Sequence, residues 1–94
     1  MGNEYLEMEE YTVHGEEEVL DAFDEFEHYN TLEPVNVKAC SPESAADIGY
    51  SELQKQINEK RKGNNSGTFS AYVTKIYFDG KLVFEKKLPT RIQW

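Results

Sequence analysis

Three side chains of this 94-residue chain have the chemistry of soft metal ligands, namely His14, His28 and Cys40. Zinc sites need such ligands at short and regular spacings, and these three are too scattered to predict one. His28 would titrate near neutral pH, but a surface histidine in the last turn of a helix is the simpler interpretation. Cys40 would need a neighbouring base and a lowered pKa to act as a nucleophile, so a small buried thiol at a strand end is the simpler interpretation.

Pairs of carboxylates, which perform general acid–base catalysis in many enzymes, can be drawn almost anywhere within residues 16–27. That density makes every single pair uninformative. The chain also lacks a glycine-rich phosphate loop and a nucleophile elbow. We therefore expect no enzymatic activity, no catalytic residues, no metal and no cofactor.

The length of the chain predicts one domain, residues 1–94, because it leaves no room for a second core. One cysteine excludes an internal disulfide and is compatible with a reducing compartment. No apolar run approaches the length of a membrane span, and the N-terminus lacks the basic and apolar regions of a signal peptide. We expect a cytoplasmic protein that does not contact membranes.

The acidic residues are concentrated in the first half of the chain. Residues 1–37 contain twelve Asp and Glu and no Lys or Arg. Residues 1–47 carry a formal charge of −13 and residues 48–94 one of +5, which together give the net charge of −8. Such a charge predicts fast association with basic partners and repulsion of nucleic acid from the first half. We expect no direct nucleic-acid binding there.

Spacing of apolar residues in the first half predicts a strand, a helix and a second strand. Residues 4–13 alternate imperfectly, as an edge or bulged strand does, and His14-Gly15 is expected to break it. Residues 16–29 show helical spacing, with acids in the first turn where the helix dipole favours them. Residues 35–39 alternate as a short strand.

The second half predicts two short helices and a hairpin. Ser41-Pro42 is typical of a helix start, and Gly49 is expected to end that helix near Ile48. A capping-box pattern at residues 51–54 predicts a further helix to about Lys62. Residues 68–78 and 81–88 flank Asp79-Gly80, a two-residue hairpin signal that sets Tyr77 opposite Leu82 and Ile76 opposite Val83. The core face expected of this hairpin holds Phe69, Ala71, Val73, Tyr77, Leu82, Phe84 and Leu88, and Ile92 and Trp94 are expected to cap the core or extend an edge.

Together these elements predict an α+β fold, a small single-domain sandwich in the order β-α-β-α-β-β. Its sheet is expected to be mainly antiparallel, to end in the hairpin at Asp79-Gly80, and to carry the helices on one face.

The predicted helix over residues 16–29 is the expected functional surface, because its acids lie opposite its apolar side chains. Seven carboxylates from Glu16 to Glu27 would give about one charge per 2.5 Å of helix, comparable with about one per 1.7 Å along duplex DNA. Like charges four residues apart cost a few tenths of a kcal/mol, and the sequence retains them. The residues expected to contact a partner are Glu17, Glu18, Asp21, Asp24 and Glu25, with Tyr29 or Trp94 as an aromatic anchor beside them.

Two functions remain open from the sequence. The first is an inhibitor whose acidic surface imitates nucleic acid and occupies the basic groove of a nucleic-acid-handling protein. Small, acidic inhibitors of this kind, including those borne by phages and mobile elements, share this composition. The second is a structural or assembly subunit in which the acidic helix is only a solvated face. Charge segregation would also allow head-to-tail self-association, including a homodimer.

Overall fold

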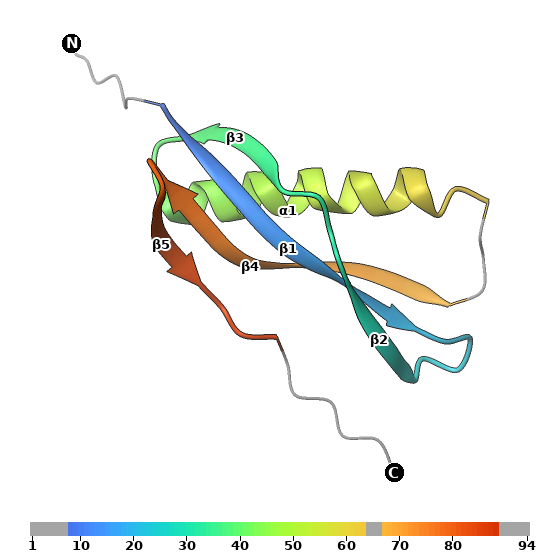
Figure 1. Ribbon diagram of the computed structural model, residues 1–94. Helices are drawn as coiled ribbons and strands as arrows, with labels where there is room; N and C mark the ends of the chain where they lie inside the picture. Colours follow the sequence, from blue (N-terminus) through green and yellow to red (C-terminus); the bar gives the residue numbers. More distant parts are fainter. Residues whose placement is uncertain (1–7, 64–66, 89–94) are drawn as a thin grey trace.

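The computed structural model describes residues 8–63 and 67–88. Its elements, in chain order, are β1 (Glu9–Leu20), β2 (Phe26–Thr31), β3 (Val35–Ala39), α1 (Pro42–Lys60), β4 (Thr68–Phe78) and β5 (Lys81–Glu85) (Figure 1). The α+β class, the antiparallel sheet and the helix on one face of it are confirmed. Ile92, Trp94 and the first residues of the strand predicted at 4–13 lie outside the described residues.

The long strand β1 is the centre of the sheet. One of its edges pairs with β4, and β4 pairs in turn with β5. The first half of its other edge pairs with β3 and the second half with β2. All four pairings are antiparallel, so neighbouring strands run in opposite directions throughout the sheet.

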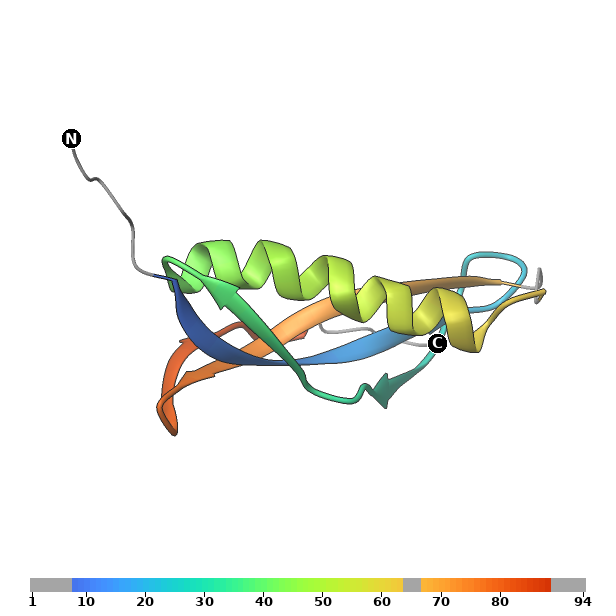
Figure 2. The same ribbon diagram turned by 90° about the horizontal axis from the view of Figure 1, so that it is seen from above.

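Helix α1 covers one face of the sheet (Figure 2). It is continuous from Pro42 to Lys60, where the sequence predicted two separate helices. The side chain of Ser41 caps its start by accepting a hydrogen bond from the Ser44 N–H at 3.1 Å, and Pro42 follows as predicted. The expected stop at Gly49 is wrong. A Cβ at Gly49 would lie 2.6 Å from Val13 Cγ1, so this glycine lets α1 approach β1 closely.

Gly49→Ala is therefore expected to lower the free energy of unfolding by about 1–3 kcal/mol through overpacking. At an exposed helix position the same change would raise it by up to about 1 kcal/mol. Val13→Ala in the Gly49→Ala background should restore part of the loss, because it removes the methyl groups that the new Cβ meets. Urea denaturation of the two single variants and the double variant measures this coupling, and additive effects would contradict it.

The structure contradicts the helix predicted for residues 16–29. Strand β1 continues through this segment to Leu20, a turn follows, and β2 begins at Phe26. The apparent helical spacing is misleading, since Val19 is buried whereas Phe23, four residues later, is 85% exposed. Strand alternation describes the burial better, because alternate residues of β1 face α1, namely Tyr11, Val13, Gly15, Glu17 and Val19.

Gly15 does not break the strand, contrary to the sequence prediction. It pairs with Val73 inside the sheet. A Cβ at this position would lie 2.5 Å from both Leu53 Cδ1 and the Tyr72 carbonyl oxygen. The glycine thus lets a core leucine of α1 rest directly on the backbone of β1.

The hairpin turn at Asp79-Gly80 is confirmed, with φ angles of 53° and 77° at its two residues. Tyr77 pairs with Leu82 as predicted, but Ile76 pairs with Phe84 because Val83 is an extra residue in β5. A second bulge, at Thr74 between the pairs His14–Lys75 and Gly15–Val73, reverses the faces of β4 beyond it.

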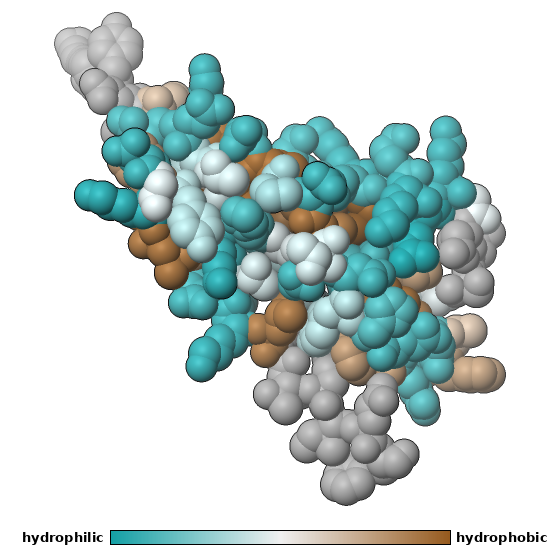
Figure 3. Space-filling model, in the orientation of Figure 1, coloured by the Kyte–Doolittle hydropathy of each residue, from teal (hydrophilic) through white to brown (hydrophobic). Residues whose placement is uncertain are grey.

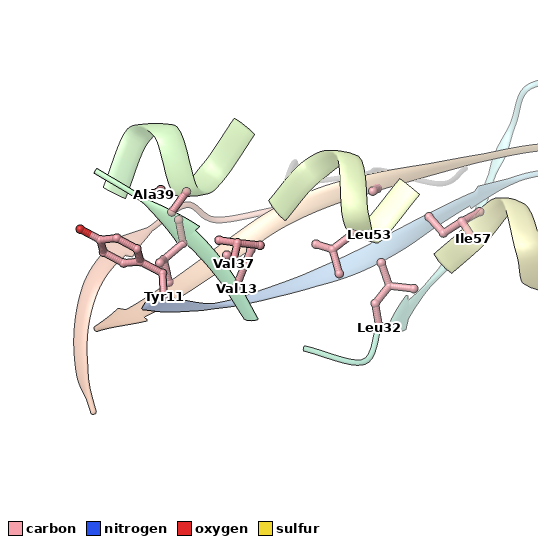
Figure 4. Close-up of a cluster of buried hydrophobic side chains, with 10 residues drawn as sticks. Tyr11, Val13, Leu32, Val37, Ala39, Leu53 and Ile57 are labelled. Atoms are coloured by element: carbon pink, nitrogen blue, oxygen red, sulfur yellow. The ribbon is translucent and has the colours of Figure 1, made fainter. Parts of the chain in front are cut away.

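These bulges change the predicted core face of the hairpin. Ile76, fully buried, takes the place expected for Tyr77, and Leu82 is 46% exposed. Phe69, Val73 and Phe84 pack against the core, and Ala71 belongs to it, as predicted. The buried cluster between α1 and the sheet is Tyr11, Val13, Leu32, Val37, Ala39, Ala45, Leu53, Ile57, Ala71 and Ile76 (Figure 4).

Candidate functional site

Three of the predicted partner-binding residues meet in the turn between β1 and β2. We call residues 21–25 the acidic turn. It is closed by backbone hydrogen bonds from the Asp21 N–H to the Glu25 carbonyl at 2.8 Å and from the Asp24 N–H to the Asp21 carbonyl at 3.0 Å. The Asp21 carboxylate accepts two more, from the Phe23 N–H at 2.8 Å and the Glu25 N–H at 3.0 Å. Asp21 therefore shapes the turn, as Asp commonly does in such loops.

Asp24 adopts a left-handed backbone conformation, with φ of 62°, which Asp tolerates better than most residues. Its carboxylate accepts a hydrogen bond of 3.4 Å from Thr68 Oγ1 at the start of β4. Gly67 also lies against the Leu20 carbonyl, where no Cβ would fit. The acidic turn is thus fixed from within and supported from β4.

Phe23 projects from the acidic turn with 85% of its surface exposed, the largest exposure among the exposed large apolar side chains of the described residues. In Figure 3, residues coloured pale brown lie among teal, hydrophilic residues at the end of the molecule where β1 turns into β2. Asp24, Glu25 and Glu27 around it are exposed. Within the described part of the chain, no Lys or Arg nitrogen lies within 4 Å of these three carboxylates or that of Asp21.

Glu17, the first of the predicted contact residues, is instead fully buried between β1 and α1. Arg61 donates to both of its oxygens, from Nε to Oε2 at 3.0 Å and from Nη2 to Oε1 at 3.2 Å. Asn30 of β2 donates to Oε1 at 3.1 Å, and Lys60 Nζ lies 3.7 Å from the same oxygen. The Arg61 guanidinium also lies 4.2 Å from the centre of the Phe69 ring.

These contacts determine the ionisation of Glu17. Burial by itself raises the pKa of a carboxyl group. The hydrogen bonds from Arg61 and Asn30 and the charges of Arg61 and Lys60 outweigh burial and hold the pKa of Glu17 below its ordinary value of 4.5. Glu17 is therefore an ionised structural anchor, neutralised by the same chain, and is not available to a partner.

Glu18 and Tyr29 lie on the face of the sheet opposite α1. They pair with one another across β1 and β2. Glu18 is only 4% exposed and accepts a hydrogen bond of 3.4 Å from the Tyr72 hydroxyl. Tyr29 packs against Phe26 with ring centres 4.8 Å apart. Neither residue joins the acidic turn.

The structure thus brings together Asp21, Asp24 and Glu25, and separates Glu17, Glu18 and Tyr29 from them. Phe23 was missed, because the helix predicted for residues 16–29 would place it among the apolar side chains that face the core. Its flanking aspartates were the available signal, since Asp favours turns and is unfavourable inside helices.

Neither a metal centre nor a membrane span is evident in the described ranges. No three His, Cys, Asp or Glu side chains of residues 8–63 and 67–88 come together as ligands. No helix in those ranges combines the length and apolar character that a bilayer crossing requires. Comparison with known proteins found no matching family model, no matching curated protein and no matching solved structure.

Proposed function

We propose that this protein is a non-enzymatic interaction module that inserts its acidic turn into a basic groove of a partner protein. The observation that carries the proposal is the 85% exposure of Phe23 on a turn fixed by hydrogen bonds and surrounded by carboxylates. A large aromatic side chain held in solvent gains free energy when a partner covers it, and aromatic anchors supply much of the energy of protein interfaces. A rigid turn also loses little conformational entropy on binding.

The carboxylates around Phe23 indicate the chemistry of the partner. Asp21, Asp24, Glu25 and Glu27 place four negative charges within seven residues, and the net charge of −8 steers the whole molecule toward positive surfaces. A groove that normally holds nucleic-acid phosphates offers such a surface. The protein would then act in the cytoplasm as an inhibitor of a nucleic-acid-handling protein by occupying that groove, as a phage-borne inhibitor would. In this proposal the acidic surface consists of the acidic turn and Glu27, in place of the longer acidic helix expected from the sequence.

Binding to the partner is expected to fall at least about 30-fold in Phe23→Ala, the loss that corresponds to a contact worth 2 kcal/mol. The double variant Asp24→Asn/Glu25→Gln should mainly slow association and reduce its salt dependence. Affinity capture with the tagged protein from its native host, followed by binding kinetics on the captured partner, measures both effects.

Matched controls separate the acidic turn from general effects of charge and exposure. Glu43→Gln/Glu59→Gln removes two exposed carboxylates of α1, and Leu82→Ala truncates an exposed apolar side chain of β5. Both controls should bind as the unmodified protein does. Added duplex DNA or RNA should compete with the captured partner. Unchanged binding by Phe23→Ala would contradict the role of the acidic turn. A captured partner that added nucleic acid does not displace would contradict the occupation of a nucleic-acid-binding groove.

A further inference from the structure

Strand β4 extends beyond the strand that should cover its outer edge. β5 pairs only with Lys75–Phe78, and one further backbone hydrogen bond joins the Lys86 N–H to the Thr74 carbonyl at 2.8 Å. From Thr68 to Val73, β4 pairs with β1 on its inner side, but no described strand lies on its outer side. This stretch of edge is six residues long, enough to pair with an added strand of ordinary length.

The backbone groups on this edge point outward at alternate residues. The Tyr72 carbonyl points inward, toward Gly15 of β1. The Ala71 N–H points the other way, because it donates to the Gln54 side chain of α1 at 3.2 Å. Since the N–H and C=O of a strand residue lie on the same side, the outward groups belong to Phe69, Ala71 and Val73.

Gln54 already binds part of this edge as a strand would. Its side-chain amide accepts from the Ala71 N–H at 3.2 Å and donates to the Phe69 carbonyl at 3.3 Å, which are the two bonds that the N–H and C=O of one residue in a parallel neighbouring strand would make. The Phe69 carbonyl and the Ala71 N–H are therefore oriented as they would be for a neighbouring strand, although Gln54 occupies both. The remaining outward groups, the Ala71 carbonyl and those of Val73, lie beyond the reach of this amide.

A groove of about 420 Å³ runs beside these remaining groups. It lies between α1 and the end of β5, and the side chains that matter here are Tyr50, Val73, Phe84 and Lys86. Tyr50 is 46% exposed, so part of this side chain remains in contact with solvent. The groove can take an apolar side chain from a strand placed on the edge.

Positive charge that is not paired within the described residues lies near the Val73 end of the edge. Lys86 lines the groove at the Val73 end, and Lys87 follows it in the chain. At the other end Arg61 lies over Phe69 but is already paired with Glu17, and the Thr68 hydroxyl donates to the Asp24 carboxylate. Within the described residues, no carboxylate lies within 4 Å of the ammonium groups of Lys62, Lys86 or Lys87. Among the described residues that line the groove, Asp47 is the one acid. A segment whose acidic end lies beside Val73 therefore complements this edge.

We propose that the outer edge of β4 from Phe69 to Val73 binds an extended acidic segment of a partner protein as an added β-strand. Backbone hydrogen bonds to Ala71 and Val73 would hold the segment, an apolar side chain would fill the groove between Tyr50 and Phe84, and carboxylates would meet Lys86 and Lys87. This second surface begins next to Thr68, which supports the acidic turn, and it takes an acidic segment where the acidic turn takes a basic groove.

A defined peptide tests the proposal on the full chain. The probe is a six-residue peptide of alternating valine and threonine with glutamate at both ends, acetylated and amidated, titrated while backbone amide resonances are followed by NMR. We expect saturable shifts centred on Phe69, Val73 and Phe84. Two matched peptides serve as controls, one N-methylated at its central residues and one with lysine in place of glutamate. Each should bind at least about tenfold more weakly, because the first cannot donate backbone hydrogen bonds and the second is repelled.

Variants of the protein complete the test. Lys86→Glu/Lys87→Glu should reverse the preference, so that the lysine-ended peptide binds better than the glutamate-ended one. Gln54→Ala frees the Phe69 carbonyl and the Ala71 N–H for the peptide, so its affinity should rise. Equal binding of the N-methylated peptide, shifts confined to the acidic turn, or an absence of binding in both the unmodified protein and Gln54→Ala would overturn the proposal. Phe23→Ala should not alter peptide binding, which keeps this test independent of the proposed function.

Discussion

Arg61→Met is expected to lower the free energy of unfolding by about 3–5 kcal/mol at pH 7, because it leaves a buried carboxylate without its main cation. Glu17 is fully buried, and Arg61 supplies two of the three side-chain hydrogen bonds that Glu17 accepts from the described residues. Lys60, at 3.7 Å and with a half-exposed side chain, can replace only part of that interaction. Methionine is long enough to cover the Phe69 ring where the guanidinium now lies, so the loss is chiefly electrostatic.

The loss should depend on pH in a direction that the pKa of Glu17 fixes. In the unmodified protein this pKa lies below 4.5, so the anchor contributes its full stability above that value and loses it as the pH falls through the lowered pKa. Without Arg61, burial should raise the pKa of Glu17 above its ordinary value. The penalty of the variant is then present at pH 7 and shrinks as the pH falls toward the ordinary value. Urea denaturation at several pH values between 4 and 7 measures the narrowing difference.

Glu17→Gln with Arg61→Met provides the control, because it removes both charges together. The double variant should be more stable than Arg61→Met alone, since no uncompensated charge remains buried. A loss below about 1 kcal/mol in Arg61→Met, the range of exposed ion pairs, would contradict the assignment of a buried anchor.

Leu53→Ala is expected to cost about 2–5 kcal/mol, the usual range for a fully buried leucine. Leu53 has no exposed surface and lies in the centre of the buried cluster between α1 and the sheet (Figure 4). It rests on β1 at Gly15, where no side chain exists to move into the vacated space. The cavity should therefore persist, which favours the upper half of the range.

Leu53→Met, which conserves volume, should cost less than about 1.5 kcal/mol. Lys55→Ala, on the exposed side of the same helix, should change stability by no more than about 0.5 kcal/mol. Thermal and urea denaturation of the three variants give the comparison. Similar losses in Leu53→Ala and Lys55→Ala would contradict the packing of α1 on β1.

The Glu17 anchor also bears on the candidate site. It joins β1, β2 and the end of α1 a few residues before the acidic turn, through Asn30 and Arg61. One of the six predicted contact residues is thus neutralised by cations of the same chain, whereas Asp21, Asp24 and Glu25 are not paired with any described Lys or Arg. The internal ion pair positions the turn, and the carboxylates left over provide its charge.

Features that depend on local backbone preference were determined by the sequence itself. Asp79-Gly80 specifies a turn with two positive φ angles, and Ser41-Pro42 specifies a helix start, because neither choice needs distant residues. The α+β class follows from the same local signals. Composition also determined the excess of acid in the first half of the chain.

Only the tertiary structure decided the conformation of residues 16–29 and hence the form of the site. The apolar residues there fit helical spacing as well as a strand, and strand β1 prevails because it pairs on both edges and because Glu17 meets Arg61, 44 residues later. Likewise, two bulges decided which side chains of β4 and β5 enter the core. Contacts between distant residues carry the free energy that selects among locally equivalent conformations, and a local pattern does not contain them.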